Sequence, residues 1–177
     1  RERMLDQNGQ LYFDFGSALD NDPAVFADAV EAGFHDLCDQ ALTFEDEGQL
    51  DAALETYRRA LQLKPEHPTL HFDVGNVLYQ LGQLEVAIEH FRSAVGLDGE
   101  FAGAWHNLGS VHAQQGKWQQ AEEALRQALS LAPSYADSHY MLATVLNAQG
   151  RQREAAQHQH AYHYHAKAEA LLASRQQ

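Results

Sequence analysis

Four of the eleven histidines of this chain fall between residues 158 and 165, where imidazole side chains could bind a metal ion. His160 and His163 are three residues apart, so a helix would place both on one face, where they could chelate zinc or nickel. On the same helix His158 and His160 would project roughly 200° apart, so the four imidazoles cannot meet at one ion. We therefore expect no metal centre, only adventitious binding at His160 and His163, and favour surface histidines without a role.

No catalytic signature accompanies these histidines. The sequence contains no G-x-S-x-G, P-loop, H-E-x-x-H or C-x-x-C pattern. The only cysteine, Cys38, excludes an internal disulfide and has no base beside it in the sequence, so we expect a small core or groove residue. Arg58 and Arg59 are expected to lie on a solvated helix face. The sequence thus predicts a protein that is not an enzyme and needs no cofactor.

A strict internal repeat sets the positions of all these residues. Glycines recur every 34 residues at Gly48, Gly82, Gly116 and Gly150, and an alanine follows each of them by five positions. With Phe34 as position 1, position 4 is Leu37, His71, Trp105 and His139, and position 8 is Ala41, Gly75, Gly109 and Ala143. Position 24 is Tyr57, Phe91, Leu125 and Gln159, and position 32 is Pro65, Gly99, Pro133 and Lys167. A fixed period of this length indicates one supersecondary unit copied along the chain.

The third copy, which contains Trp105-His106-Asn107-Leu108-Gly109, resembles the tetratricopeptide repeat, whose signature is W-x-x-L-G-x-x-Y, then A-x-x-x-F and a closing proline. The resemblance implies four copies, at 34–67, 68–101, 102–135 and 136–169, and an all-α fold. The expected architecture is a right-handed α-solenoid of antiparallel helix pairs with a C-terminal capping helix. We expect helices near 34–47, 51–63, 68–81, 85–97, 102–115, 119–131, 136–149 and 152–173.

Each recurring residue type has a packing reason. The glycine at position 15 ends the first helix of a copy, because that end commonly needs a residue at positive φ. Small residues at positions 8 and 20 let the two helices approach closely, and leucines at position 30 (Leu63, Leu97 and Leu131) are expected to fill the remaining space. Copy four lacks the closing proline, so its second helix is expected to continue as the cap, with residues 170–177 as its end and tail.

Residues 1–33 do not fit the repeat and form a leader. Leu11, Phe13 and Phe15 alternate with polar or aromatic residues, which predicts an extended segment. Asp22 and Pro23 are typical of a helix start, and we expect a short helix through about Glu31. The apolar side chains could pack across the solenoid end or lie in a groove, either their own or that of a second copy in a homodimer.

The chain begins at Arg1, so we expect a fragment of a larger protein. Its aromatic-acidic leader before repeats also resembles the tails of bacterial regulators with a MerR-type DNA-binding head.

The charge limits the classes of partner. The net charge is −13: residues 1–66 hold 15 acidic and 5 basic side chains, residues 67–135 hold 7 and 3, and residues 136–177 hold 3 and 4. An acidic front half argues against direct nucleic-acid binding and is compatible with a basic or neutral protein or peptide. No apolar run reaches the length of a membrane span, so we expect no membrane partner and a cytoplasmic location.

In the tetratricopeptide family the first helices of the copies form a concave wall, at positions 2, 5, 6, 9, 12 and 13. The resemblance therefore implies a peptide groove lined by Phe72, Asp73, Asn76, Tyr79, His106, Asn107, Ser110, Tyr140, Met141 and Thr144. Family members that bind chaperones clamp a terminal carboxylate with basic side chains and asparagines. Asn76 and Asn107 match the asparagines, but the basic positions fall at Phe72, Asp137 and Met141, which argues against such a clamp.

Two functions remain open at this point. The first is a non-catalytic scaffold that binds a peptide segment of another protein in the concave groove. The alternative is the C-terminal sensory or assembly tail of a bacterial transcription regulator whose DNA-binding head is absent from this chain. The identity of the partner does not follow from the sequence.

Overall fold

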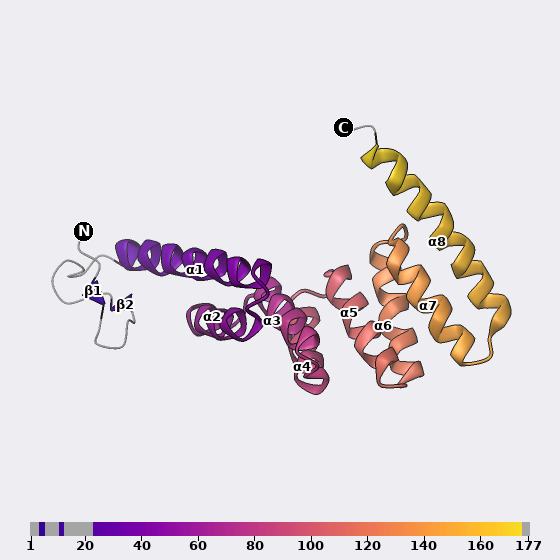
Figure 1. Ribbon diagram of the computed structural model, residues 1–177, viewed down its shortest axis with the longest axis horizontal. Coiled ribbons are helices and arrows are strands. Elements are labelled where there is room, and N and C mark those ends of the chain that lie inside the picture. Colours follow the sequence, from indigo (N-terminus) through magenta and orange to yellow (C-terminus); the bar gives the residue numbers. More distant parts are fainter. Residues whose placement is uncertain (1–3, 6–10, 13–22, 175–177) are drawn as a thin grey trace.

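The computed structural model describes residues 4–5, 11–12 and 23–174, and nearly all of them are helical (Figure 1). In chain order the elements are β1 (Met4–Leu5), β2 (Leu11–Tyr12), α1 (Pro23–Asp46), α2 (Leu50–Leu63), α3 (Pro68–Gln80), α4 (Leu84–Leu97), α5 (Ala102–Gln114), α6 (Trp118–Leu131), α7 (Ala136–Ala148) and α8 (Gln152–Ala173). The two short strands pair antiparallel, Met4 with Tyr12 and Leu5 with Leu11. The predicted all-α solenoid of helix pairs is confirmed.

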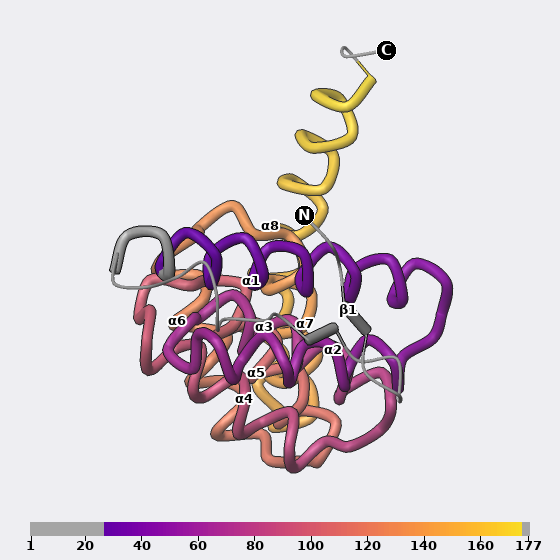
Figure 2. The backbone as a smooth tube through the Cα atoms, turned by 90° about the vertical axis from the view of Figure 1, so that its left-hand side faces the viewer, coloured from indigo at the N-terminus to yellow at the C-terminus, as the bar shows by residue number. Residues whose placement is uncertain are grey.

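The helices stack in the order of the sequence. Each one packs mainly against its neighbours in the chain, so α1 and α2 lie at one end and α7 and α8 at the other (Figures 1 and 2). We call the first helix of each copy (α1, α3, α5, α7) an A helix and the second (α2, α4, α6, α8) a B helix. This order is the one expected of a solenoid, in which each repeat buries its apolar face against the next.

The glycine at position 15 closes every A helix in the same way. Gly48, Gly82, Gly116 and Gly150 have φ of 72°, 74°, 71° and 78°, in the left-handed region that favours glycine. At Gly116 the glycine N–H bonds to the Ala113 carbonyl at 2.9 Å, and the next N–H, of Lys117, bonds to the His112 carbonyl at 2.9 Å. These bonds satisfy carbonyls at the end of the helix and turn the chain into the B helix.

Small residues bring the two helices of a copy into close contact, as predicted. Ala53, Ala87 and Ala121 at position 20 are fully buried. A Cβ atom added to Gly109 would lie 2.7 Å from Leu125 Cγ and 3.1 Å from the Ala121 carbonyl oxygen. The hairpin therefore excludes even a methyl group at position 8 of this copy.

One prediction about the core is wrong for two of the three leucines that it named, whereas Leu131 is half-buried. Leu63 and Leu97, at position 30, are 39% and 43% exposed and do not fill the hairpin. Position 28 makes this contact instead, because Leu61 and Val95 pack against the buried cluster of copies one to three. Position 28 lies about 200° from position 30 around the helix, so only one of the two can face the neighbouring helix.

The first helix also differs from the prediction. The sequence suggested a short helix through Glu31 and a new helix from Phe34, but α1 runs without a break from Pro23 to Asp46. No proline stands between Glu31 and Phe34 to stop the helix. Phe34 is only 4% exposed and belongs to the core. Whether residues 1–33 form a unit separate from the repeats stays a prediction.

Much of the leader lies outside the described residues. Phe13, Phe15 and Asp22 are among the residues that the structure does not describe. The burial of the leader and a homodimer through it therefore stay predictions. Within the described residues, no helix is both long and apolar enough to cross a membrane.

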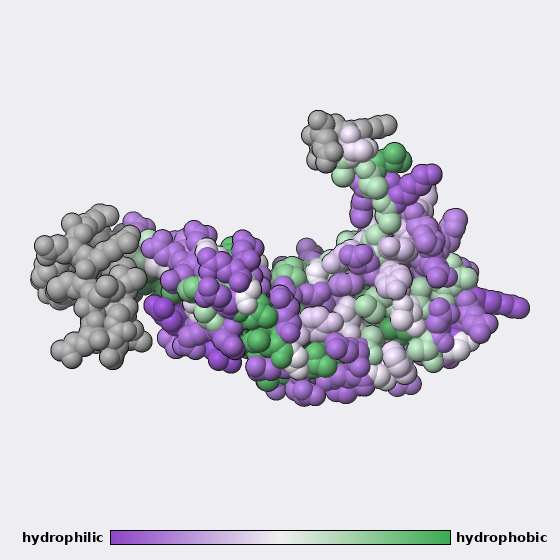
Figure 3. Space-filling model, viewed as in Figure 1, coloured by the Kyte–Doolittle hydropathy of each residue, from purple (hydrophilic) through white to green (hydrophobic). Residues whose placement is uncertain are grey.

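The last helix continues beyond the repeat pattern, as expected for a cap. It has 22 residues, against 13 in α7, and its end projects past the stacked helices (Figures 1 and 2). Ala155 is its only buried residue, and Leu171 and Leu172 are 54% and 61% exposed. Figure 3 shows apolar atoms near this projecting end, apart from a second apolar patch in the lower middle of the stacked helices.

Candidate functional site

A cavity of about 430 Å³ opens on the A helices of the solenoid. Its lining residues come from α1, α3, α4, α5 and α7, so it crosses all four copies: Glu45, Asn76, Tyr79, Gln80, Phe91, His106, Asn107, Ser110, Val111 and Met141. We call this cavity the groove. An opening shared by several repeats can take an extended ligand, which a pocket within one helix pair could not.

Six residues of the expected groove lie together in this cavity. They are Asn76, Tyr79, His106, Asn107, Ser110 and Met141. Four lining residues were not among the candidates: Glu45, Gln80, Phe91 and Val111. Glu45 and Gln80 stand at wall-forming positions 12 and 13, so the repeat register was sufficient to find them. Phe91 is a core residue whose edge reaches the cavity, which the register does not indicate.

The other expected groove residues lie outside the cavity. Phe72 packs against the core, with its ring centroid 4.8 Å from that of Phe101 and 6.0 Å from that of Phe91. Tyr140 is 53% exposed, and its ring lies 5.3 Å from that of Tyr162 on the capping helix. Thr144 is exposed and donates its hydroxyl to the Tyr140 carbonyl. Asp73 is half-buried and does not line the cavity.

Two asparagines join copies two and three at the centre of the groove. Asn107 Nδ2 donates to Asn76 Oδ1 at 2.6 Å, and both side chains are half-buried. An amide has two acceptor sites and two donors, so Asn107 Oδ1 and the Asn76 amino group keep free hydrogen-bonding capacity. No other described residue bonds to them. The pair therefore offers an acceptor and a donor to whatever enters the groove.

His106 joins copies three and four. Its Nδ1 lies 2.9 Å from the hydroxyl of the fully buried Ser138 on α7, and its ring centroid is 4.9 Å from that of Tyr135. Burial lowers the pKa of His106, while the negative charge of Asp137 acts in the opposite direction. A neutral imidazole is thus favoured at this side of the groove.

The opposite end of the groove is acidic. Tyr57, fully buried, donates its hydroxyl to Glu45 Oε2 at 2.6 Å. Burial, and then the charge of Glu45, raise the pKa of Asp73 to about 6. No described residue donates a hydrogen bond to the Asp73 carboxylate or forms an ion pair with it. The groove thus changes from the Glu45 carboxylate at copy one to neutral and apolar side chains at copies three and four.

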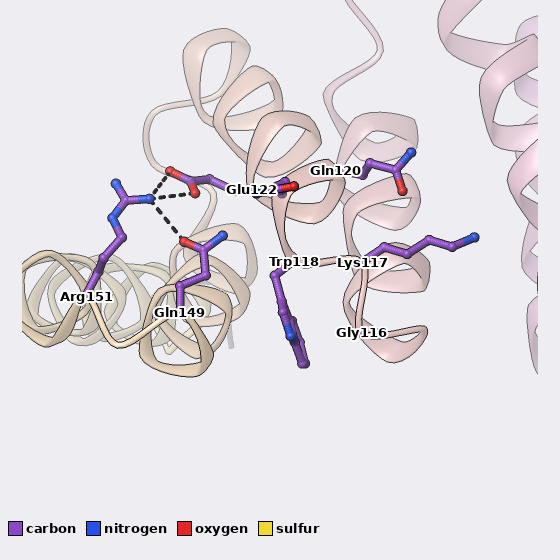
Figure 4. Close-up of a pocket in the computed structure, with 8 residues that line it drawn as sticks. Gly116, Lys117, Trp118, Gln120, Glu122, Gln149 and Arg151 are labelled. Atoms are coloured by element: carbon purple, nitrogen blue, oxygen red, sulfur yellow. Dashed lines mark hydrogen bonds and ion pairs between the residues drawn. The ribbon is translucent and has the colours of Figure 1, made fainter.

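A second, larger opening of about 620 Å³ lies between the helix-to-helix turns of copies three and four. Figure 4 shows Glu122 and Gln149 pointing toward Arg151, whereas Lys117 and Gln120 point away from it. Arg151 Nη1 lies 2.6 Å from Glu122 Oε2 and 3.1 Å from Gln149 Oε1. Because these polar groups already satisfy one another, we take the A-helix groove, with its free amides and carboxylates, as the candidate site.

The histidines have partners that the sequence did not reveal. His139 Nδ1 lies 2.9 Å from His158 Nδ1, and the His165 ring stacks on His139 with centroids 5.6 Å apart. His158 is thus half-buried against His139 rather than on the open surface, and the expectation that it has no functional role stays a prediction. His160 and His163 are both exposed. Within the part of the chain that the structure describes, no three histidine, cysteine or acidic side chains form a metal-binding group.

Comparisons with known proteins identify the repeat. Family models described as "TPR repeat" match residues 42–82 and 75–116, and one described as "Tetratricopeptide repeat" matches residues 102–135. No curated protein matches the sequence.

The solved structures that resemble this chain include a crystal structure of MamA, with 20% identity and a TM-score of 0.73, covering 83% of this chain and 85% of that one. MamA residues 41 to the end from Desulfovibrio magneticus RS-1 give 20% identity and a TM-score of 0.70, with 76% of each chain covered. The first TPR of Spaghetti (RPAP3), bound to the HSP90 peptide SRMEEVD, gives 19% identity and a TM-score of 0.65, covering 67% of this chain and 94% of that one. At these identities the likeness establishes the fold alone.

Proposed function

Because the chain belongs to the tetratricopeptide repeat family, we propose that it is a non-catalytic scaffold whose groove binds an extended peptide segment of a partner protein. The RPAP3 repeat domain, which has this fold, is described with a peptide bound. In this chain the proposal is supported by a cavity that crosses all four copies and has unpaired amide groups at its centre.

The Asn76–Asn107 pair carries the proposal. An extended peptide presents its own N–H and C=O groups, which need an acceptor and a donor once water is removed. Asn107 Oδ1 and the Asn76 amino group supply one of each, and the bond between the two side chains holds them in place. Such hydrogen bonds are made to the peptide backbone, so they set the path of a peptide without requiring a particular sequence.

The partner segment is basic or neutral rather than acidic. The basic side chains of a carboxylate clamp have no counterpart here, because Phe72, Asp137 and Met141 occupy their positions. Glu45 instead places negative charge at one end of the groove. A peptide such as SRMEEVD, which carries two glutamates, an aspartate and a terminal carboxylate, would meet like charges in this groove and is expected not to bind.

Binding to capped decapeptides on an array, followed by titration of the best binder, tests this function. Asn107→Ala should weaken binding by about 1–3 kcal/mol, because a backbone group of the peptide loses its partner. Lys117→Ala is the matched control: Lys117 lies in the turn between α5 and α6, away from the groove, and its loss should leave the affinity unchanged. Equal losses from both substitutions, or none from either, would place the site elsewhere on the molecule.

A further inference from the structure

We propose that His112, buried where copies two and three meet, makes the groove release its peptide in acid. The inference rests on the proposed peptide binding and adds regulation to it. We call the contact between α4 of copy two and α5 of copy three the joint. The groove crosses these same two copies, since Asn107 of α5 bonds to Asn76 of copy two at 2.6 Å. A change at the joint therefore reaches the centre of the groove.

His112 stands at position 11 of its copy, which holds a large apolar residue in the other three copies. Leu78 and Leu146 are fully buried at this position, and Phe44 packs against the core. His112 lies almost as deep, with 3% of its surface exposed. Leucine would fill such a place without burying a polar ring, so the packing of the repeat does not require a histidine here.

No side chain is arranged to accept a proton from this imidazole. Its Nδ1 is buried and bonds to no described residue. The half-buried histidines of the same repeats are paired instead: the Nδ1 atoms of His71 and His90 lie 3.1 Å apart, and those of His139 and His158 lie 2.9 Å apart. A buried imidazole without an acceptor is stable only when neutral, because the charged form loses its hydration and gains no hydrogen bond.

The charges at the joint also oppose protonation. Arg92 acts on His112 from α4 and Lys117 acts from the turn after α5, and both are positive. Burial first, and then these two charges, lower the pKa of His112. Glu85 of α4 accepts the side-chain amide of Gln115 at 3.1 Å. Among the described residues, no carboxylate of α4 and no charged side chain of α3, α6 or α7 shifts the pKa of His112.

Protonation would act on the groove through α5. A third positive charge at the joint disfavours the close contact of α5 with α4. His112 directly follows Val111, which lines the groove, and Asn107 lies on the same helix. A shift of α5 against α4 therefore moves the groove wall and strains the bond between Asn107 and Asn76. Because each repeat contacts only its neighbours, the joint can open without unfolding of the whole chain.

The direction of the pH effect follows from proton binding. In an open joint the pKa of His112 returns toward its ordinary value of about 6.5, so the open state binds the proton more readily than the closed one. The closed joint is fully stable above about pH 6.5 and loses stability as the pH falls through the lowered pKa of His112. His106 and Asp73 also have shifted pKa values, so the test compares proteins that keep both.

The test replaces His112 by two residues that cannot titrate. His112→Leu supplies the residue of copies two and four, whereas His112→Gln keeps a polar side chain, so the two variants differ in packing but share the loss of the proton site. An NMR titration of the full chain should place the midpoint of His112 below the ordinary value. Saturation with the best-binding capped decapeptide should lower that midpoint further, because the linkage between proton and peptide is reciprocal.

Two further measurements are made at the midpoint of His112. Relative to its affinity at pH 7, the wild-type protein should bind the decapeptide about twofold more weakly than either variant does, because half of its molecules carry the proton that opens the joint. Hydrogen exchange without peptide should be faster in α4 and α5 of the wild-type protein than in those helices of either variant.

A midpoint at or above the ordinary value would overturn the inference, and so would the same loss of affinity in the wild-type protein and both variants. Faster exchange in α4 and α5 without a change in affinity would also overturn it, because the joint would then open without controlling the groove. If Asn107→Ala weakens binding while the affinity does not depend on His112, peptide binding stands and only the regulation fails. If no peptide binds at pH 7, both proposals fall.

Discussion

One hydrogen bond recurs at position 4 with two residue types. His71 Nε2 bonds to the Pro65 carbonyl at 2.9 Å, His139 Nε2 to the Pro133 carbonyl at 3.0 Å, and Trp105 Nε1 to the Gly99 carbonyl at 2.9 Å. The carbonyl accepts the proton of Nε2, so the neutral His71 presents Nδ1 as an acceptor to His90 Nδ1 at 3.1 Å. The partner of His71 lies 19 residues away on α4, at position 23 of the same copy, and His139 and His158 repeat this spacing in copy four.

The half-buried pair of His71 and His90 predicts acid sensitivity. Burial, then the charges of His71 and Arg58, lower the pKa of His90 to about 4, against about 6.5 in an unfolded chain. The unfolded state binds the proton more readily, so the stability from neutral His90 is complete above pH 6.5 and is lost as the pH falls through 4. His90→Asn keeps a donor for His71 but cannot titrate. Between pH 7 and pH 4.5 the variant should gain about 1–2 kcal/mol of unfolding free energy relative to wild type, less than full linkage because the site keeps contact with water. Urea unfolding at each pH measures the difference. Parallel curves for His90→Asn and the wild-type protein would contradict the prediction.

At the scale of elements, the sequence predicted features that only a few residue types can form. It did not predict features for which the same residues are compatible with several conformations. The positive φ of Gly82 and the burial of Ala87 were predictable, since few residue types meet those demands. The continuous α1 was not, because the stretch from Glu31 to Phe34 contains no signal strong enough to stop or require a helix. The exposed Leu97 shows the same limit, since an apolar residue near a helix end fits either face.

Two glycines in helices should respond oppositely to alanine. Gly109→Ala puts a methyl group against Leu125 and the Ala121 carbonyl, so the hairpin must open, at a cost of about 1–3 kcal/mol. Gly96 lies in α4 with no atom within 4 Å of an added Cβ, so Gly96→Ala should stabilise by about 0.5–1 kcal/mol through helix propensity alone. Thermal unfolding of both variants measures the two signs. A change of the same sign in both would mean that the close approach of α5 and α6 does not determine stability.

For the whole molecule, the core divides into two clusters, one in copies one to three and one centred on copies three and four. Between the last two copies the apolar pattern changes. Position 21 is a buried Leu54 or Ile88 in copies one and two, but Glu122 in copy three, with 16% of its side chain exposed. Arg151 holds this carboxylate at 2.6 Å and Arg126 at 2.9 Å. The repeat pattern predicted the stacking but not this exchange of apolar for ionic contact, because the arginine comes from the next copy.

Copy four should therefore depend on an ion pair more than the other copies do. Arg151→Ala leaves Glu122, with 16% of its side chain exposed, paired with Arg126 alone and should lower the unfolding free energy. Glu122→Leu removes the buried charge, restores the residue type of copies one and two and leaves Arg151 paired with Glu154, so it should cost less than about 1 kcal/mol. Because repeats contact only their neighbours, Arg151→Ala should speed hydrogen exchange in α7 and α8 and leave α3 and α4 unchanged. Urea unfolding and exchange mass spectrometry give the two readouts. Equal destabilisation by both substitutions, or faster exchange along the whole chain, would mean that copy four folds as one unit with the rest and that the ion pair is not its anchor.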